Sequence, residues 1–154
     1  METRLKALAQ ASARIFAAPS LEETLRLITA AAREIVGAQQ AVTSLTTDGS
    51  WAQAIVSVSL SDKYAAWRDF DAKPSGKGIY ALVCAQNRPM RLTQAELDAH
   101  PGFKRFSDAA GRHPPLRGWL AAPLMARDGA NLGLVQLSDK DQGDFDENDE
   151  AMLV

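Results

Sequence analysis

The chain has 154 residues, of which 46% are hydrophobic and 23% charged, and its formal net charge is −2. This length suits one domain with a substantial core. Lys and Arg are scattered along the chain, which argues against a nucleic-acid partner. The apolar runs are far shorter than the ~20 residues that cross a bilayer, and the N-terminus lacks the layout of a secretion signal, so we expect no membrane contact. A single cysteine, Cys84, excludes an internal disulfide and favours a cytoplasmic location.

Two helices are predicted at the N-terminus. Residues 3–17 carry apolar side chains at helical spacing, and a second helical stripe covers residues 20–36. Ser20 and Glu23 have the spacing of a capping box, and Gly37 stands where a helix is expected to stop. The stripe of the first helix consists of Leu5, Leu8, Ile15 and Phe16.

The remaining pattern predicts two antiparallel hairpins and short helices. The hairpins pair Ala41–Thr46 with Ala52–Val58, and Gly118–Met125 with Leu132–Ser138. Antiparallel hairpins with helices grouped at the ends are typical of an α+β domain. The other predicted elements are an irregular loop over 59–77, a helix over Gly78–Gln86, a strand over Met90–Leu92, helical pieces over 93–110, and a final helix from Phe145 that we expect to continue beyond Val154.

Several segments of the C-terminal half resemble the GAF family. A His-Pro-Pro segment leads into one predicted strand, and a partner strand follows. The closing residues are similar to the family's Asn-Lys…Phe-x-x-x-Asp-Glu signature, with Asp in the Asn place. The resemblance covers roughly residues 20–154, and it rests on His113–Leu124, on Asn131–Leu137, and on Asp139, Lys140, Phe145, Asp149 and Glu150.

This resemblance implies an architecture and a division of the chain. A central antiparallel sheet of five or six strands is expected, with the N- and C-terminal helices on one face. Short helices and loops are expected to cover a pocket on the other face. Residues 1–18 are then a signalling and dimerisation helix, and residues 19–154 are the sensory domain. We therefore expect a homodimer through the terminal helices.

The resemblance also implies a function. We expect a small-molecule-sensing regulatory domain of a signal-transduction protein, and not an enzyme. The expected parent is a sensor histidine kinase of a two-component system, with a diguanylate cyclase or a GAF-regulated transcription activator as alternatives. The GAF-fold methionine sulfoxide reductases need several cysteines, because a second thiol must resolve the sulfenic acid. Neither the ligand nor the output domain can be predicted from these residues.

Nine side chains are candidates for the pocket. Most are aromatic, and aromatic residues can line a cavity or fill a core. We expect about half of the aromatic residues to touch the cavity. The candidates are Tyr64, Trp67, Phe70, Tyr80, Cys84, Phe103, Phe106, His113 and Trp119.

Two alternative ligands remain open, although no cofactor or metal is expected. His113 occupies the place of an axial heme ligand in some related sensor domains, so a gas or redox sensor is one alternative. Cyclic-nucleotide binding is the other, because Gly78 begins a predicted helix and could offer backbone N–H groups to a phosphate. A covalent bilin is not expected, because Cys84 is followed by Ala85 rather than His.

The closing signature predicts one ion pair. Lys140 and Asp149 are expected to pair as a partly exposed contact that fixes the final helix to the sheet. This role is structural and does not involve a ligand.

Overall fold

The structure is a computed structural model of the chain. It describes residues 2–17, 20–47, 53–67, 79–99 and 117–153. None of the helices in these ranges is both long and apolar enough to span a membrane.

Helices α1 (Glu2–Phe16) and α2 (Leu21–Val36) form where the apolar stripes predict them. The Ser20 hydroxyl accepts a hydrogen bond from the Glu23 backbone N–H at 3.1 Å, which caps α2 as predicted. A complete capping box would direct the Glu23 carboxylate to Ser20, but that carboxylate accepts two hydrogen bonds from Arg26 instead. Gly37 ends α2 with a left-handed φ of 83°, which a residue without a Cβ adopts at little cost.

Five strands form one antiparallel sheet within the described residues, in the order β2-β1-β5-β4-β3. Both predicted hairpins are present, and the central contact joins β1 of the first hairpin to β5 of the second. The strands are β1 (Ala38–Thr46), β2 (Gln53–Leu60), β3 (Met90–Leu92), β4 (Trp119–Met125) and β5 (Asn131–Lys140).

Strand β1 begins at Ala38, before the predicted start at Ala41. Two glutamines follow Ala38, and their polarity hides the strand from a pattern search. Gln40 is nevertheless only 3% exposed, because it pairs with Leu60 of β2 on one side and Ser138 of β5 on the other. The position of Gln40 between two neighbouring strands therefore outweighs the low preference of a polar side chain for a strand.

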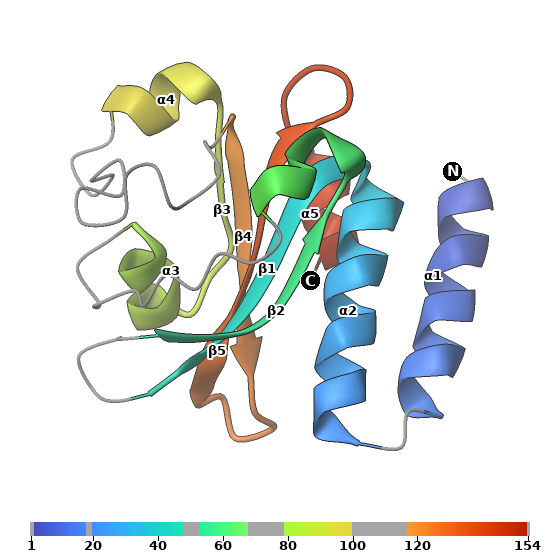
Figure 1. Cartoon of the computed structure of the whole chain (residues 1–154). Coiled ribbons are helices and arrows are strands. Elements are labelled where there is room, and N and C mark those ends of the chain that lie inside the picture. The colour runs from blue at the N-terminus through green and yellow to red at the C-terminus, as the bar shows by residue number, and fades with distance from the viewer. Residues whose placement is uncertain (1, 18–19, 48–52, 68–78, 100–116, 154) are drawn as a thin grey trace.

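The helices lie on both faces of the sheet (Figure 1). Helix α2 and the C-terminal helix α5 (Glu147–Leu153) cover one face, which we call the α2 face. Helices α3 (Tyr80–Gln86) and α4 (Gln94–Ala99) lie on the opposite side, the α3 face. The 3₁₀ helix η1 (Asp62–Trp67) directly follows β2. This arrangement confirms the predicted α+β architecture.

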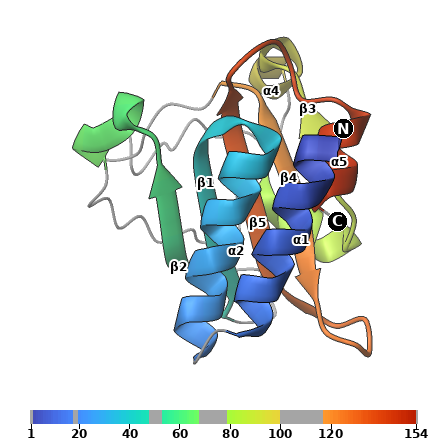
Figure 2. The ribbon, with the colours of Figure 1, turned by 90° about the vertical axis from the view of Figure 1, so that its right-hand side faces the viewer.

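Helix α1 packs beside α2 (Figure 2) and lies farther from the sheet than α2 does (Figure 1). It is therefore an outer layer. Because α2 already covers strands β1 and β2, the sheet does not need α1 for cover.

Each face of the sheet has its own apolar cluster. The cluster on the α2 face joins that helix to α5 through the buried side chains of Val36, Ala38, Ala41, Leu120, Leu137 and Phe145. The cluster on the α3 face, here called the Trp119 cluster, consists of Ile79, Val83, Cys84, Leu97, Trp119, Ala121 and Leu134.

Strands β1 and β5 approach unusually closely at Gly133. A Cβ atom added there would lie 2.0 Å from the backbone oxygen of Ser44, and the φ of Gly133 is +156°. Real Cβ atoms do not approach that closely, so only glycine fits between the two central strands.

Candidate functional site

Three of the predicted pocket side chains meet on the α3 face of the sheet. Trp119 begins β4, is 0% exposed, and donates its indole N–H to Gln136 Oε1 at 3.1 Å. Cys84 of α3 is 1% exposed and belongs to the same cluster. Tyr80, one helical turn before Cys84, is half-buried and packs against this cluster.

Neutral polar side chains accompany this apolar cluster. The Thr46 hydroxyl lies 2.8 Å from Asn131 Oδ1 and 3.8 Å from Cys84 Sγ. Asn131 in turn donates to Asn87 Oδ1 at 3.0 Å. Together with Gln136 beside Trp119, these groups give the α3 face hydrogen-bonding capacity within an apolar setting. Binding pockets for small molecules commonly have this composition.

Sequence reasoning missed these polar residues. Thr46 and Gln136 occupy strand positions on the α3 face, where a plain core would carry apolar side chains. A polar residue at an inward strand position was the signal that could have identified them. Asn131 and Asn87 lie in or beside turns, where the pattern gives no such signal.

Several predicted candidates lie outside the described residues. These are Phe70, Phe103, Phe106 and His113, together with the side chain of Trp67. The segment 48–52, which joins the two strands of the first hairpin, and most of the predicted loop over 59–77 also lie outside them.

Tyr64 is buried at a different place, next to the end of β5. Its hydroxyl donates to Asp139 Oδ2 at 2.6 Å, and Lys63 Nζ contacts the same oxygen at 2.5 Å. Burial, and then the hydrogen bond to Asp139, raise the pKa of Tyr64. Burial alone would raise the pKa of Asp139, but the hydrogen bonds from Lys63 and Tyr64 prevail and lower it. Asp139 is therefore a charged anchor for η1.

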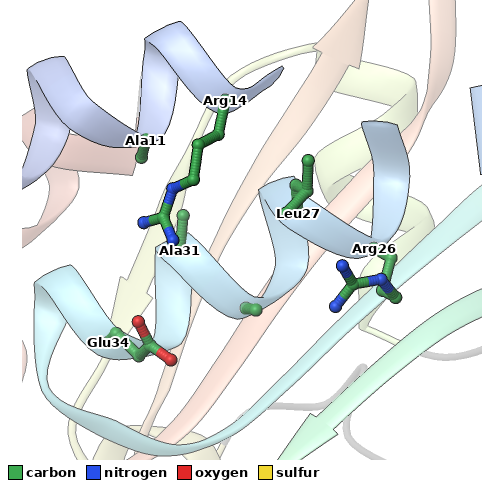
Figure 3. A pocket seen from close by; sticks show the side chains of 7 residues that line it. Ala11, Arg14, Arg26, Leu27, Ala31 and Glu34 are labelled. Carbon is green, nitrogen blue, oxygen red and sulfur yellow. The ribbon is translucent and has the colours of Figure 1, made fainter. Parts of the chain in front are cut away.

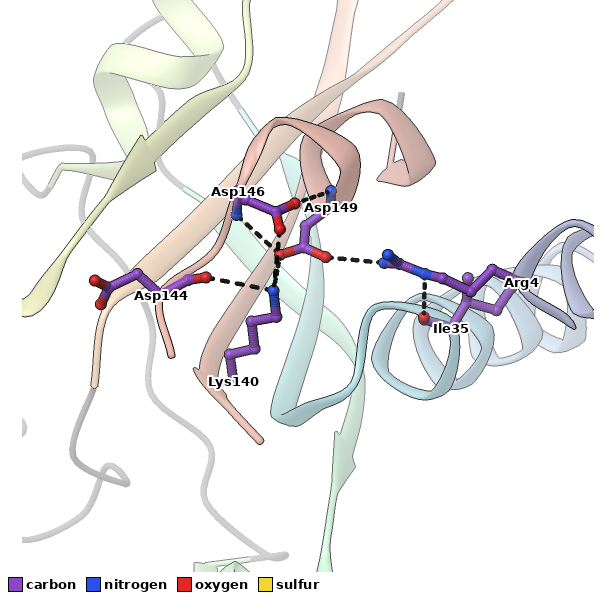
Figure 4. A network of polar contacts seen from close by, with 6 residues as sticks. All are labelled: Arg4, Ile35, Lys140, Asp144, Asp146 and Asp149. Atoms are coloured by element: carbon purple, nitrogen blue, oxygen red, sulfur yellow. Dashed lines mark hydrogen bonds and ion pairs between the residues drawn. The ribbon is translucent and has the colours of Figure 1, made fainter. Parts of the chain in front are cut away.

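The pair predicted from the closing signature is present. Lys140 Nζ lies 2.5 Å from Asp149 Oδ2, and it also contacts the Asp144 carbonyl oxygen at 3.3 Å (Figure 4). Asp146 and Asp149 cap the start of α5 by exchanging hydrogen bonds between side chain and backbone N–H, each at 2.9 Å. The hydrogen bond from the Asp149 N–H lowers the pKa of Asp146.

A second cation at Asp149 was not predicted. Arg4 of α1 donates to Asp149 Oδ1 at 2.8 Å and to the Ile35 carbonyl oxygen at 3.2 Å (Figure 4). Asp149 is 0% exposed, so the Lys140–Asp149 pair is more buried than the partly exposed contact that the sequence predicts. We call Arg4, Lys140, Asp146 and Asp149 the Asp149 joint, because it connects α1, the end of β5 and α5.

The two other signature residues have structural positions. Phe145 is 6% exposed and packs in the cluster on the α2 face. The Oε1 atom of Glu150 lies 4.0 Å from Nη1 of Arg91 in β3.

A groove of about 180 Å³ lies between α1 and α2 (Figure 3). Its apolar lining consists of small or medium side chains, while charged side chains stand at its rim. The lining includes Ala11, Leu27, Ala30 and Ala31, and the charged residues are Arg14, Arg26 and Glu34.

The fold places the chain among α+β domains of the regulatory, ligand-binding class. Residues 18–154 match the family model of the GAF domain, and the chain belongs to that family. The matched region begins after α1, so Arg4 contacts the domain from outside it.

Solved structures with the same fold come from proteins of different activities. A GAF domain from a phosphoenolpyruvate-protein phosphotransferase of Coxiella burnetii is 25% identical, with a TM-score of 0.77, over 98% of this chain and 86% of that chain. The GAF domain of the Acinetobacter phosphoenolpyruvate-protein phosphotransferase is 16% identical, with a TM-score of 0.74, over 98% and 85%. A free methionine-R-sulfoxide reductase from Neisseria meningitidis is 18% identical, with a TM-score of 0.74, over 97% and 81%. The last two likenesses concern the fold alone.

Proposed function

We propose that this chain senses a small molecule on the α3 face of its sheet and passes the occupancy of that site to an output domain through its terminal helices. The observation that carries the proposal is the contrast between the two faces. The α2 face is closed by α2 and α5 over an apolar cluster. The α3 face combines the buried indole of Trp119 with neutral hydrogen-bonding side chains under short helices.

A thermal-shift screen of neutral metabolites tests this proposal. We expect at least one compound to raise the melting temperature, and Gln136→Met to weaken its binding at least tenfold. The reason is that the substitution removes an acceptor beside Trp119 without removing bulk. Gln142→Met is the matched control, since Gln142 is exposed. If no compound stabilises the protein, or if both variants bind equally, the site is not on this face.

We further propose that the domain binds its ligand without heme or bilin, does not catalyse a reaction, and resides in the cytoplasm. The lack of catalysis is supported by Cys84, the chain's single thiol, which is buried within the Trp119 cluster. A sulfoxide reductase cycle requires a second, resolving thiol.

The purified domain is therefore expected to be colourless and to gain no Soret band on reconstitution with hemin. The absorbance spectrum checks this result directly. A stoichiometric Soret band that disappears in His113→Ala would establish the heme-sensor alternative. Stabilisation by cyclic AMP or cyclic GMP in the thermal-shift assay would establish the cyclic-nucleotide alternative instead.

For the parent protein we propose a signal-transduction protein, with a sensor histidine kinase as the expectation from the sequence. A phosphoenolpyruvate-protein phosphotransferase is a second candidate, favoured by the 25% identity of the Coxiella burnetii domain over 98% of this chain. Incubation of the full natural protein with labelled ATP and, separately, with labelled phosphoenolpyruvate distinguishes them by the donor that labels it.

We also propose a homodimer through the terminal helices. Leu5 of α1 is 51% exposed, although it belongs to the predicted apolar stripe. The groove between α1 and α2 is lined by small side chains, against which a helix of a second copy can pack. Its rim carries Arg14 and Glu34, so two copies related by a two-fold axis can pair these opposite charges.

Light scattering is expected to show a dimer for the full chain and a folded monomer after removal of residues 1–18. Leu5→Glu is expected to give the same monomer, because it places a charge in the apolar contact. Leu132→Glu is the control, since Leu132 is comparably exposed (49%) but lies at the β4–β5 hairpin. A full chain that stays monomeric at high concentration contradicts the proposal.

A further inference from the structure

The end of β5 holds two neighbouring residues that bind different parts of the molecule. Asp139 accepts hydrogen bonds from Tyr64 and Lys63 of η1, at 2.6 and 2.5 Å. Lys140, the next residue, binds Asp149 of α5 at 2.5 Å. One peptide unit therefore separates the anchor of η1 from the Asp149 joint.

The backbone at this position is constrained. Asp139 has a φ of 59°, in the left-handed region that few residues other than glycine and asparagine adopt readily. Its N–H donates to the Arg117 carbonyl oxygen at 2.8 Å, so the end of β5 is also bound to the backbone two residues before β4. The backbone of Asp139 therefore has little freedom to change its conformation when the contacts of the Asp139 side chain change.

The aspartate at this position departs from the pattern that the chain otherwise resembles, in which the residue before the lysine is asparagine. Asparagine suits the left-handed backbone equally well, so the backbone alone does not require an acid. What the acid adds is a charge, and the structure shows the partner of that charge in Lys63.

On the other side of Lys140, the contacts continue to the N-terminal helix. Asp149 binds Lys140 through Oδ2 and Arg4 through Oδ1, and Arg4 also binds the last turn of α2 at Ile35. Two sets of polar contacts therefore meet at the end of β5: Tyr64 and Lys63 bind Asp139, and Lys140 binds Asp149, which also binds Arg4. The peptide bond between Asp139 and Lys140 joins the two sets into one series.

We propose that this series of contacts couples two events, the binding of η1 by Asp139 and the docking of α1 at Asp149. Each of these two contacts stabilises the other. In the proposed sensory function, on which this meaning rests, η1 is part of the sensory domain and directly follows its edge strand β2. Release of η1 then loosens α1 and α5, which are the helices proposed to carry the signal. Coupling of this kind is a free energy shared by two sites, and it must act equally in both directions.

Hydrogen exchange of the full chain, without any ligand, tests the coupling. Asp139→Asn keeps the shape and the backbone preference of the residue but removes its charge. We expect faster exchange in residues 62–67 and, as the effect of coupling, at least threefold faster exchange in α1 and α5. Helices α3 and α4 should keep their protection, which separates coupling from a general loss of stability.

The matched control is Asp141→Asn, which removes a charge two residues further on. Asp141 is exposed and contacts Gln39 rather than η1 or the Asp149 joint, so exchange in α1 should remain unchanged. Tyr64→Phe serves as a second variant if Asp139→Asn does not fold, because it deletes only the hydroxyl that Asp139 accepts.

Reciprocity supplies the decisive measurement. Arg4→Gln should loosen α1 and also raise exchange in residues 62–67, because the coupling acts in both directions. If Asp139→Asn frees η1 and leaves α1 unchanged, or if Arg4→Gln leaves η1 unchanged, the coupling is absent. Both outcomes are independent of whether the α3 face binds a ligand, so failure here is distinguishable from failure of the proposed function.

Discussion

Asp149→Ala is expected to lower the free energy of unfolding by about 3 kcal/mol, the lower end of the range for removing one partner of a buried ion pair. Asp149 is 0% exposed, and its carboxylate is bound by Lys140 and Arg4, which keep 17% and 30% of their side chains exposed. Their remaining hydration limits the cost of losing their common partner. In a domain of this size the loss corresponds to a fall in melting temperature of roughly 6–12 °C.

Chemical denaturation of the variant and of Glu147→Ala measures this effect. Glu147 is an exposed acid in the first turn of the same helix, so its removal should cost well under 1 kcal/mol. An equally small effect for Asp149→Ala would mean that the joint behaves as an exposed ion pair, as the sequence alone suggests.

Gly133→Ala is expected to be at least as damaging, with a loss of about 3–5 kcal/mol from backbone strain and overpacking together. The new methyl group would meet the backbone oxygen of Ser44 at 2.0 Å, and a backbone atom cannot rotate away as a flexible side chain can. Strands β1 and β5 must therefore separate, and they form the central contact of the sheet.

Gly129→Ala is a matched control for the glycine effect. Gly129 has a φ of +88°, but a Cβ there meets nothing within 4 Å, so only the cost of the left-handed backbone remains, about 1–2 kcal/mol. A comparison of the two melting temperatures isolates the steric part. If both variants lose the same stability, the close approach at Ser44 is not what requires a glycine at position 133.

The elements of this fold were predictable because their signals are local. Ser20 caps α2 and Gly37 ends it, and each residue acts on backbone groups within a few positions of itself. The apolar runs of β4 and β5 are likewise visible from neighbouring residues, and the apolar stripe places α2 against the sheet. The start of β1 was not predicted correctly from local signals. Gln40 is buried there because it pairs with strands on both sides, β2 and β5.

The contacts of the candidate site were less predictable, because they join residues that are distant in sequence. Trp119 and Cys84 were found as large or apolar side chains, but their polar neighbours Gln136 and Thr46 were not. Arg4 meets Asp149 across almost the whole chain, and nothing near Arg4 distinguishes it from any other charge on an amphipathic helix. Such a partner can be identified only when the arrangement of the helices around the sheet is known.

The burial of Cys84 makes the chain a convenient background for site-selective labelling. As the chain's single thiol, at 1% exposure, it reacts with a maleimide in the folded state only through an opening of the structure. A cysteine placed at an exposed position, such as Ala13 of α1 or Asn148 of α5, would react far sooner. Fluorophores or spin labels at those two positions would report the distance between the terminal helices without prior replacement of the native thiol.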